Sequence, residues 1–334
     1  MNRFPGPAGD RGSDAEPAIH VRGLTRRFGA VTAVDGLSFD VAPGELFGIV
    51  GPDGAGKTTT VRMLAGVLRP TSGEARVTGI SVARDPEKVK HRIAYMAQRF
   101  GLYEDLTVRE NLDFYADLYG VPRETRPERL ERLFAFSGLA PFANRLAGRL
   151  SGGMKQKLSL SCALVHEPEI LLLDEPTFGV DPISRRDLWL ILHEMVARGT
   201  TILVTTAYMD EAERCDRVAL LHEGRLLALA PPRELQEEME GGILEVRVEP
   251  SRRAAEVLRT DPGVRRAAPY GDVVHVSVPG GMDAWPALRD ALEREGLRPE
   301  EATPAEPSLE DVFLARTSEP GAGETAFSGE PADV

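Results

Sequence analysis

The sequence predicts an α/β domain built around a parallel sheet, followed by a smaller α+β domain. Leu46–Val50 and Ile170–Leu173 consist almost entirely of hydrophobic residues, which is typical of strands buried on both faces of a sheet. Segments with helical spacing alternate with such strands, and this alternation predicts a parallel sheet. From Ile243 onward the order of expected elements changes to β-α-β-β-α, which indicates a small split-βαβ domain.

The elements expected in the first domain lie within residues 18–240. Strands are expected at Ile19–Leu24, Leu37–Val41, Leu46–Val50, Arg76–Thr78, Ile93–Met96, Ile170–Leu173, Thr201–Thr205, Arg217–Leu221 and Arg225–Leu229. Helices are expected at Thr59–Leu68, Val108–Leu118, Glu128–Phe136, Ser151–Leu164, Leu188–Ala197 and Met209–Arg214. The last two strands are expected to pair as a hairpin over Glu223-Gly224.

The second domain is expected over residues 241–316. Its strands are expected at Ile243–Val248, Val264–Ala268 and Val273–Val278, and its helices at Arg252–Leu258, Trp285–Glu295 and Ser308–Leu314. Residues 1–17 and the acidic residues 317–334 are rich in Gly, Pro, Ser or Ala and are expected to be disordered tails.

The composition limits the possible functions. The chain has 334 residues, 42% of them hydrophobic, which is enough for one large and one small core. A formal net charge of −12 argues against broad neutralisation of nucleic-acid phosphates, so no nucleic-acid partner is expected. Cys162 and Cys215 are expected to be small buried residues in a reducing compartment. No apolar run approaches the ~18–20 residues of a membrane-crossing helix, so we expect a cytoplasmic protein unless a partner holds it at a membrane.

The most specific motif is a glycine-rich loop between the strand Leu46–Val50 and the next helix. It fits the pattern G-x4-G-K-[ST], in which successive backbone N–H groups cradle phosphate oxygens. Lys57 is expected to reach the β- and γ-phosphates, and Thr58 to bind Mg²⁺. The expected nucleotide-binding residues of this segment are Gly51, Pro52, Asp53, Gly54, Ala55, Gly56, Lys57, Thr58 and Thr59. The loop predicts a P-loop NTPase.

Two further motifs follow the phosphate loop. Asp174 and Glu175 end the strand Ile170–Leu173, where the first acid can hold Mg²⁺ and the second can orient and polarise the attacking water. Ser151, Gly152 and Gly153 begin a helix and provide a second anion site. Since one nucleotide needs one such site, we expect the second to serve a nucleotide held by another subunit.

With these three motifs in this order, the chain resembles the nucleotide-binding subunit of ABC transporters over about Ile19–Leu235. The resemblance implies an ABC-type ATPase domain with a helical subdomain at about 100–165, which binds ATP and Mg²⁺ and hydrolyses ATP. It also implies that Phe28 stacks on adenine, that Gln98 senses the γ-phosphate and assists catalysis and Mg²⁺ binding, and that Asp181 acts in a loop that crosses a dimer. Each of these three residues alone also fits an ordinary structural role.

Features toward the end of the chain narrow the resemblance to one branch of the family. The added domain with Pro307–Leu314, together with Ala207–Cys215, is similar to ATPase subunits of ABC-2-type exporters, such as daunorubicin-resistance-like and multidrug or lipid exporters. This implies an integral-membrane ABC-2-type permease as partner, docked near Phe100–Val108, and a second ATPase domain. The protein would then lie at the inner face of the membrane. The alternatives are a soluble ABC ATPase without a transport role and a regulatory subunit that binds ATP with little hydrolysis.

The sequence departs from the family pattern at Ala207, where the family places a histidine that contacts the γ-phosphate and the catalytic water. A methyl group cannot donate a hydrogen bond, and loss of one such donor typically costs about 10²–10³-fold in rate. Either Thr206 or Tyr208 substitutes for it, or the site is impaired. An impaired site favours a non-identical second ATPase over a homodimer. The sequence also departs from the family pattern at Met154, where family members often have Gln, but this departure is less important than Ala207.

Overall fold

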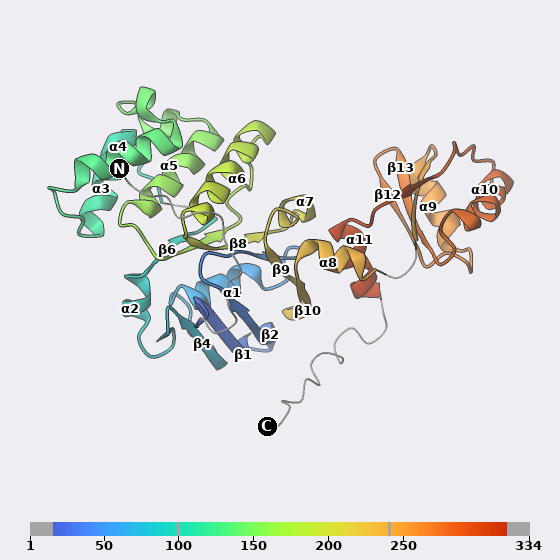
Figure 1. The fold of residues 1–334 in the computed structure, drawn as a ribbon, viewed down its shortest axis with the longest axis horizontal. Helices are drawn as coiled ribbons and strands as arrows, with labels where there is room; N and C mark the ends of the chain where they lie inside the picture. The colour runs from blue at the N-terminus through green and yellow to red at the C-terminus, as the bar shows by residue number, and fades with distance from the viewer. Residues whose placement is uncertain (1–15, 99–100, 240–241, 319–334) are drawn as a thin grey trace. The chain divides into compact units, whose positions relative to one another are not determined.

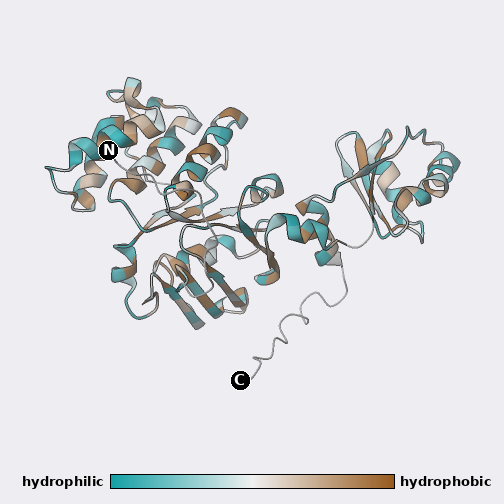
Figure 2. Cartoon of the chain, in the orientation of Figure 1, coloured by the Kyte–Doolittle hydropathy of each residue, from teal (hydrophilic) through white to brown (hydrophobic). Residues whose placement is uncertain are grey.

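The computed structural model describes residues 16–98, 101–239 and 242–318 (Figure 1). The chain divides into two compact units, with the boundary between Leu229 and Ala230 at the end of β10. Unit 1 contains all the nucleotide-binding motifs, and unit 2 contains the small α+β domain. In Figure 2 hydrophobic residues concentrate in the strands of the sheets, as their burial requires.

The central sheet of unit 1 has six strands in the order β10-β9-β3-β8-β7-β6. They are β3 (Leu46–Val50), β6 (Ile93–Met96), β7 (Ile170–Asp174), β8 (Thr201–Thr206), β9 (Arg217–His222) and β10 (Arg225–Ala230). β3 runs parallel to β8 and β9, and β7 runs parallel to β6 and β8. The register places Val50 opposite Thr206 and Asp174 opposite Thr205, so three chemically active segments leave the same edge of the sheet.

A second, antiparallel sheet has the order β2-β1-β4-β5. Its strands are β1 (Ile19–Phe28), β2 (Val31–Val41), β4 (Ser72–Val77) and β5 (Ile80–Ser81). β1 and β2 are longer than predicted, because pairing between them continues through polar, partly exposed residues whose hydrophobic pattern is weak. This sheet shares one hydrophobic core with β3 and with α1 (Lys57–Leu64).

The predicted helix Thr59–Leu68 is wrong at both ends. α1 begins at Lys57, directly after Gly56, and ends at Leu64. The chain leaves the helix through Gly66, whose φ of +65° is the left-handed conformation that glycine adopts without strain. The short α2 (Pro86–Lys90) was not predicted, and it packs near Gly66 through Pro86.

The helices between β6 and β7 have a hydrophobic core of their own. They are α3 (Val108–Leu118), α4 (Arg126–Ser137), the 3-10 turns Ala140–Phe142 and Ala147–Arg149, and α5 (Gly152–Leu164). A capping box begins α3: the Thr107 Oγ1 accepts from the Glu110 N–H at 3.2 Å, and the Glu110 carboxylate accepts from the Thr107 N–H at 2.8 Å. Cys162 lies inside this core, and burial raises the pKa of its thiol.

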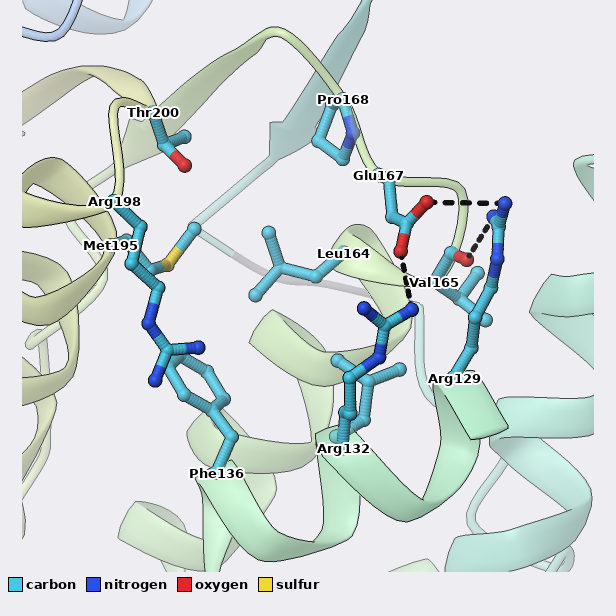
Figure 3. A pocket seen from close by; sticks show the side chains of 11 residues that line it. Arg129, Arg132, Phe136, Leu164, Val165, Glu167, Pro168, Met195, Arg198 and Thr200 are labelled. Carbon is cyan, nitrogen blue, oxygen red and sulfur yellow. Dashed lines mark hydrogen bonds and ion pairs between the residues drawn. The ribbon is translucent and has the colours of Figure 1, made fainter. Parts of the chain in front are cut away.

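A pocket lies between α4, the loop after α5, and α6 (Pro182–Ala197) (Figure 3). Its lining combines apolar side chains with three arginines. The Glu167 carboxylate pairs with Arg132 at 2.7 Å and with Arg129 at 3.1 Å, so it neutralises charge from two turns of α4. These contacts fix α4 to the segment that leads into β7.

Unit 2 contains an antiparallel sheet in the order β12-β13-β11-β14. Its elements are α8 (Pro232–Glu237), β11 (Gly242–Arg247), α9 (Ser251–Arg259), β12 (Arg266–Tyr270), β13 (Val273–Val278), the 3-10 turn Gly281–Ala284, α10 (Trp285–Arg294), β14 (Thr303–Ala305) and α11 (Leu309–Ser318). α9 and α10 pack on the sheet around Leu244, Val246, Val274 and Leu292. The short β14 and the helix α8 were missed, because neither carries enough hydrophobic periodicity to identify it.

A cluster of polar side chains fixes the start of α11 to the sheet of unit 2. Ser308 and Asp311 form reciprocal capping contacts: the Ser308 hydroxyl donates to the Asp311 Oδ2 at 2.7 Å and accepts from the Asp311 N–H at 3.1 Å. On β13, the His275 Nδ1 lies 3.2 Å from the same Oδ2. Burial alone would raise the pKa of Asp311, but the hydrogen bonds from His275 and Ser308 outweigh it and hold the pKa below its ordinary value.

No helix in the described ranges combines the length and the apolar character needed to cross a membrane. The expected disordered tails, residues 1–17 and 317–334, lie almost wholly in residues 1–15 and 319–334, outside the described part of the chain, although α11 extends to Ser318.

Candidate functional site

The phosphate loop connects β3 to α1 and has room only for glycine at two positions. A Cβ atom on Gly51 would lie 2.2 Å from the carbonyl oxygen of Leu221, and one on Gly56 would lie 2.5 Å from that of Ala33. Gly56 also has φ of +99° as the N-cap of α1. The sequence therefore selects a tight turn that directs the first N–H groups of α1 toward the loop, which is the geometry of an anion site.

Lys57 is the first residue of α1, and its ammonium group is enclosed by the loop. Its Nζ donates to the carbonyl oxygens of Gly51 at 2.8 Å and Pro52 at 3.1 Å. It also lies 3.1 Å from the Glu175 Oε1. Because the side chain is only 4% exposed, its charge acts in a site that largely excludes water.

Asp174 at the end of β7 accepts hydrogen bonds from three elements, α1, β8 and β6. Its Oδ1 accepts from the Thr58 hydroxyl at 2.9 Å and from the Thr205 hydroxyl at 2.9 Å, and Tyr95 on β6 donates to Oδ2 at 3.4 Å. The structure thus brings Thr58 and Asp174, two of the predicted metal ligands, together. Hydroxyl and carboxylate oxygens fit the preference of Mg²⁺ for oxygen ligands.

Glu175 follows directly and has a strained backbone, with φ of +48°. Its N–H donates to the Thr205 hydroxyl oxygen at 2.9 Å. Its two carboxylate oxygens contact Lys57 and the Gln98 side-chain amide, which donates to Oε2 at 3.0 Å. Lys57, Gln98, Asp174 and Glu175 therefore form one cluster, as their predicted roles require.

Ala207 lies just after β8 and lines a pocket with Glu175 and Asp53. The pocket also includes Thr177, Phe178, Thr206 and Tyr208. The position matching the family's histidine therefore faces the same space as Glu175, and it presents a methyl group there.

The structure separates the two candidates for replacing the missing histidine. Thr206 is 1% exposed, its hydroxyl donates to the Glu211 carboxylate at 2.7 Å, and its oxygen accepts from the Tyr208 N–H at 3.0 Å. Its hydroxyl is committed to these contacts, so the alternative that Thr206 substitutes is disfavoured. Tyr208 is 38% exposed and its ring packs against the guanidinium of Arg185 at 4.6 Å.

The predicted second anion site contacts α6 rather than the phosphate loop. The Ser151 hydroxyl caps α5 by accepting from the Met154 N–H at 3.3 Å. Asp181 caps α6 in the same manner, accepting from the Ser184 N–H at 3.0 Å. The two helix starts touch, because a Cβ atom on Gly153 would lie 2.1 Å from the Ser184 Oγ. Ser151–Gly153 and Asp181 thus form one surface, which no contact joins to the phosphate loop among the described residues.

Phe28 lies at the end of β1 and is 46% exposed. The guanidinium of Arg26 stands 4.4 Å from its ring centre, so one face of the ring is already covered by a cation–π contact. No contact joins Phe28 to the phosphate loop in the described part of the chain. Its stacking role remains a prediction.

The predicted permease-docking segment begins at Phe100, which lies outside the described residues. The part that follows is held by Asn111, a buried residue of α3 that sequence reasoning missed. Its amide nitrogen donates to the carbonyl oxygens of Tyr103 and Thr107 at 3.0 and 2.9 Å, and its oxygen accepts from the Tyr103 N–H at 2.9 Å. The signal was available, since a polar residue stands on the apolar face of α3.

Comparison with known proteins gives the same assignment. Residues 34–178 match the family described as ABC transporter. The daunorubicin/doxorubicin resistance ATP-binding protein DrrA of Streptomyces peucetius is 38% identical over 310 residues, covering 91% of this chain and 93% of that protein. The probable multidrug ABC transporter ATP-binding protein YbhF of Escherichia coli (strain K12) is 51% identical over 228 residues, or 68% of this chain. This chain spans only 39% of that relative's length.

A solved structure described as the ATP binding subunit of an ABC transporter has a TM-score of 0.60 and 32% identity, covering 66% of this chain and 92% of that one. The fold and the cluster around Lys57 and Glu175 define an ABC-type ATP-binding domain of the P-loop NTPase fold. The chain belongs to the family of ABC transporter ATP-binding proteins. The family and the fold class predicted from the sequence are confirmed.

Proposed function

We propose that this protein is the ATP-binding and ATP-hydrolysing subunit of an ABC-2-type membrane exporter. The observation that supports this most is the cluster of Lys57, Thr58, Asp174 and Glu175 at one edge of the parallel sheet. It joins a phosphate-binding loop, a pair of oxygen ligands and a carboxylate that can accept a proton. The reaction is attack of water on the γ-phosphorus of ATP, with cleavage of its bond to the oxygen shared with the β-phosphate, to give ADP and phosphate.

The roles follow from the contacts. The N–H groups of the phosphate loop and the Lys57 ammonium bind the β- and γ-phosphates, and Glu175 orients the attacking water and accepts its proton. Gln98 holds the second carboxylate oxygen of Glu175. Thr58, Asp174 and Gln98 would hold Mg²⁺, which when bound neutralises phosphate charge.

A second ATPase domain is proposed to complete each site. Ser151, Gly152 and Asp181 are exposed, with Gly153 buried between them against Ser184, and they lie away from the phosphate-loop contacts within this chain. Such a surface offers a helix N-terminus to a phosphate held by another subunit. Binding of ATP would close two domains head to tail, and hydrolysis would reopen them.

The proposed membrane partner is an integral-membrane ABC-2-type permease that contacts the segment around Tyr103. This side chain is 44% exposed, yet its backbone is fixed by Asn111, so it presents an ordered apolar surface. The names of the relatives, which include a multidrug transporter, daunorubicin/doxorubicin resistance and Nod factor export, support an exporter, and we propose drugs, lipids or similar compounds as its substrates. The protein would then lie on the cytoplasmic face of the membrane.

The methyl group of Ala207 favours a second candidate function for the site it lines. If Tyr208 does not replace the histidine, that site binds ATP and hydrolyses it slowly, and a non-identical ATPase partner supplies the competent site. The extreme form of this candidate is a regulatory subunit with little hydrolysis.

The exporter proposal can be tested with the full chain carrying Glu175→Gln, which should retain ATP and hold the closed state. Purification from detergent-solubilised membranes of the native host should recover one integral-membrane protein in stoichiometric amount. Tyr103→Asp should lose this partner, whereas exposed Glu87→Gln should keep it. Recovery of the chain without any membrane protein, but with intact ATP binding, would favour a soluble ABC ATPase.

A further inference from the structure

A buried carboxylate lies beneath the loop that carries Ala207. Glu211, on the short helix α7 (Met209–Ala212), is 1% exposed. Its Oε2 accepts from the Thr206 hydroxyl at 2.7 Å and from the Thr177 hydroxyl at 2.8 Å. One side chain thus ties the segment after β8 to the segment after Glu175.

The cation that faces this carboxylate comes from α6. The Arg185 Nε lies 3.3 Å from the Glu211 Oε1, although neither atom makes an aligned hydrogen bond. The guanidinium also packs against the Tyr208 ring. The backbone N–H of Arg185 donates to the Asp181 carbonyl oxygen at 2.9 Å, within the first turn of α6. Arg185 therefore belongs to the helix turn that contacts Gly153 through the neighbouring Ser184.

The other end of this network reaches the phosphate loop. The Gly51 N–H donates to the carbonyl oxygen of Thr206 at 3.3 Å. Thr206 is thus held through its carbonyl by the start of the phosphate loop and through its hydroxyl by Glu211. A continuous set of contacts connects the first turn of α6 to the loop that carries Ala207.

These contacts contribute little stability by themselves. Burial of the Glu211 carboxylate costs solvation free energy that its two hydroxyl hydrogen bonds and the unaligned contact with the partly exposed Arg185 offset only in part, and apolar residues of similar size often stabilise a protein as well or better. The same contacts are well suited to holding a loop in one position, because they join four separate segments.

We infer that Glu211 and Arg185 are positioning residues for ATP hydrolysis. They hold the loop Thr206–Tyr208 at a fixed distance from Glu175 and link it to the helix turn beside Ser151–Gly153. A second ATPase domain that contacts this helix turn would thereby affect the position of the loop Thr206–Tyr208 relative to Glu175. Neither residue touches the reacting atoms. The inference rests on the proposed hydrolysis at this site.

The test measures kcat, KM for ATP and thermal unfolding of the full chain. Glu211→Gln keeps the size of the side chain and removes its charge, and it should lower kcat about tenfold or more with KM changed less than twofold, since small misplacements have large effects on rate. Asp210→Asn, at the exposed neighbouring position, should leave kcat unchanged.

The double variant Arg185→Met with Glu211→Gln separates positioning from stability. Removing both charges should restore the unfolding temperature that either single change lowers, while kcat stays low. If the double variant regains kcat together with the unfolding temperature, the pair is merely structural and the inference is wrong. Unchanged kcat in Glu211→Gln would also overturn it.

A variant at the partly exposed Tyr208 tests the same network without disturbing a buried charge. Tyr208→Leu removes the ring that packs against Arg185 and should lower kcat with KM changed less than twofold. Unchanged kcat in Tyr208→Leu would contradict the inference. Glu175→Gln serves as reference: if it abolishes hydrolysis and Glu211→Gln does not, only the positioning role fails. A wild-type chain that binds ATP without hydrolysing it would overturn this inference and favour the regulatory candidate over the hydrolysing one.

Discussion

Each unit of the molecule contains a buried aspartate, and the two are held in different ways. Asp174 in unit 1 accepts from Thr58 on α1, Thr205 on β8 and Tyr95 on β6, three segments far apart in the sequence. Asp311 in unit 2 accepts mainly from Ser308, three residues away, and from His275. The first acid lies where strands converge, and the second caps one helix.

The surroundings of the two acids differ as well. Asp174 is followed by Glu175 in a strained backbone conformation, beside the enclosed ammonium of Lys57. Asp311 stands in an unstrained helix start. Strain and concentrated charge cost stability and persist where they serve a reaction, whereas a satisfied cap contributes stability. Changes in unit 1 should therefore alter chemistry, and changes around Asp311 should alter stability.

The largest expected effect follows from Glu175→Gln. Glutamine cannot accept the proton of the attacking water, so kcat for ATP hydrolysis should fall about 10²–10⁴-fold. The affinity for ATP should stay within a few-fold, because the phosphate loop is unchanged. Steady-state hydrolysis and titration with a fluorescent ATP analogue measure the two quantities. A variant that keeps its turnover would remove Glu175 from the catalytic role.

Lys57→Ala should weaken ATP binding by about 100-fold, since a charged hydrogen bond in an enclosed site typically contributes about 1.5–3 kcal/mol. The same titration measures it. Lys90→Ala, at an exposed lysine paired with Glu87, is the matched control and should bind like wild type. Equal affinities for both variants would show that the loop does not bind phosphate.

Ala207→His should raise the turnover of the purified chain about tenfold, because it supplies a hydrogen-bond donor to the pocket that Glu175 lines. Ala207→Leu adds bulk without a donor and should give no increase. Fast wild-type hydrolysis that Ala207→His leaves unchanged would argue that the site is competent without the histidine and that no unequal partner is needed.

The smallest effect concerns the pH dependence of unit 2. The hydrogen bond with Asp311 raises the pKa of His275 above its ordinary value of 6.5 despite partial burial. The stabilisation is therefore complete below about pH 6.5 and is lost as the pH rises through the folded-state value. The lowered pKa of Asp311 means that its own contribution is present above 3.8 and is lost in stronger acid.

Unit 2 should consequently lose about 1.5 kcal/mol between pH 6 and a pH well above neutrality, on the scale of one charged hydrogen bond. Hydrogen exchange of peptides from β13 and α11, corrected for the intrinsic pH dependence, measures it in the full chain. His275→Gln should abolish the pH dependence. ATP affinity should not follow the same profile, and a parallel change would contradict the separation of roles between the units.

The sequence by itself determined the class of the protein and most of its elements. Gly51, Gly56 and Lys57 form a signal within eight residues, and Asp174 and Glu175 end a recognisable apolar strand. These features are local: a turn that only glycine permits and a buried strand both depend on neighbours in the sequence. The same holds for the alternation that predicted the parallel sheet.

Only the tertiary structure decided which polar groups share a partner. Thr205 meets Asp174 because the register of β7 and β8 places them side by side, and no pattern within either strand encodes that choice. In the same way, the sequence leaves open whether Thr206 replaces the histidine. The structure decides against it, because the Thr206 hydroxyl donates to the Glu211 carboxylate. Hydrogen bonds between distant segments depend on packing and strand register, and both form only when the whole chain folds. A single side chain cannot specify its partner across 30 residues or more.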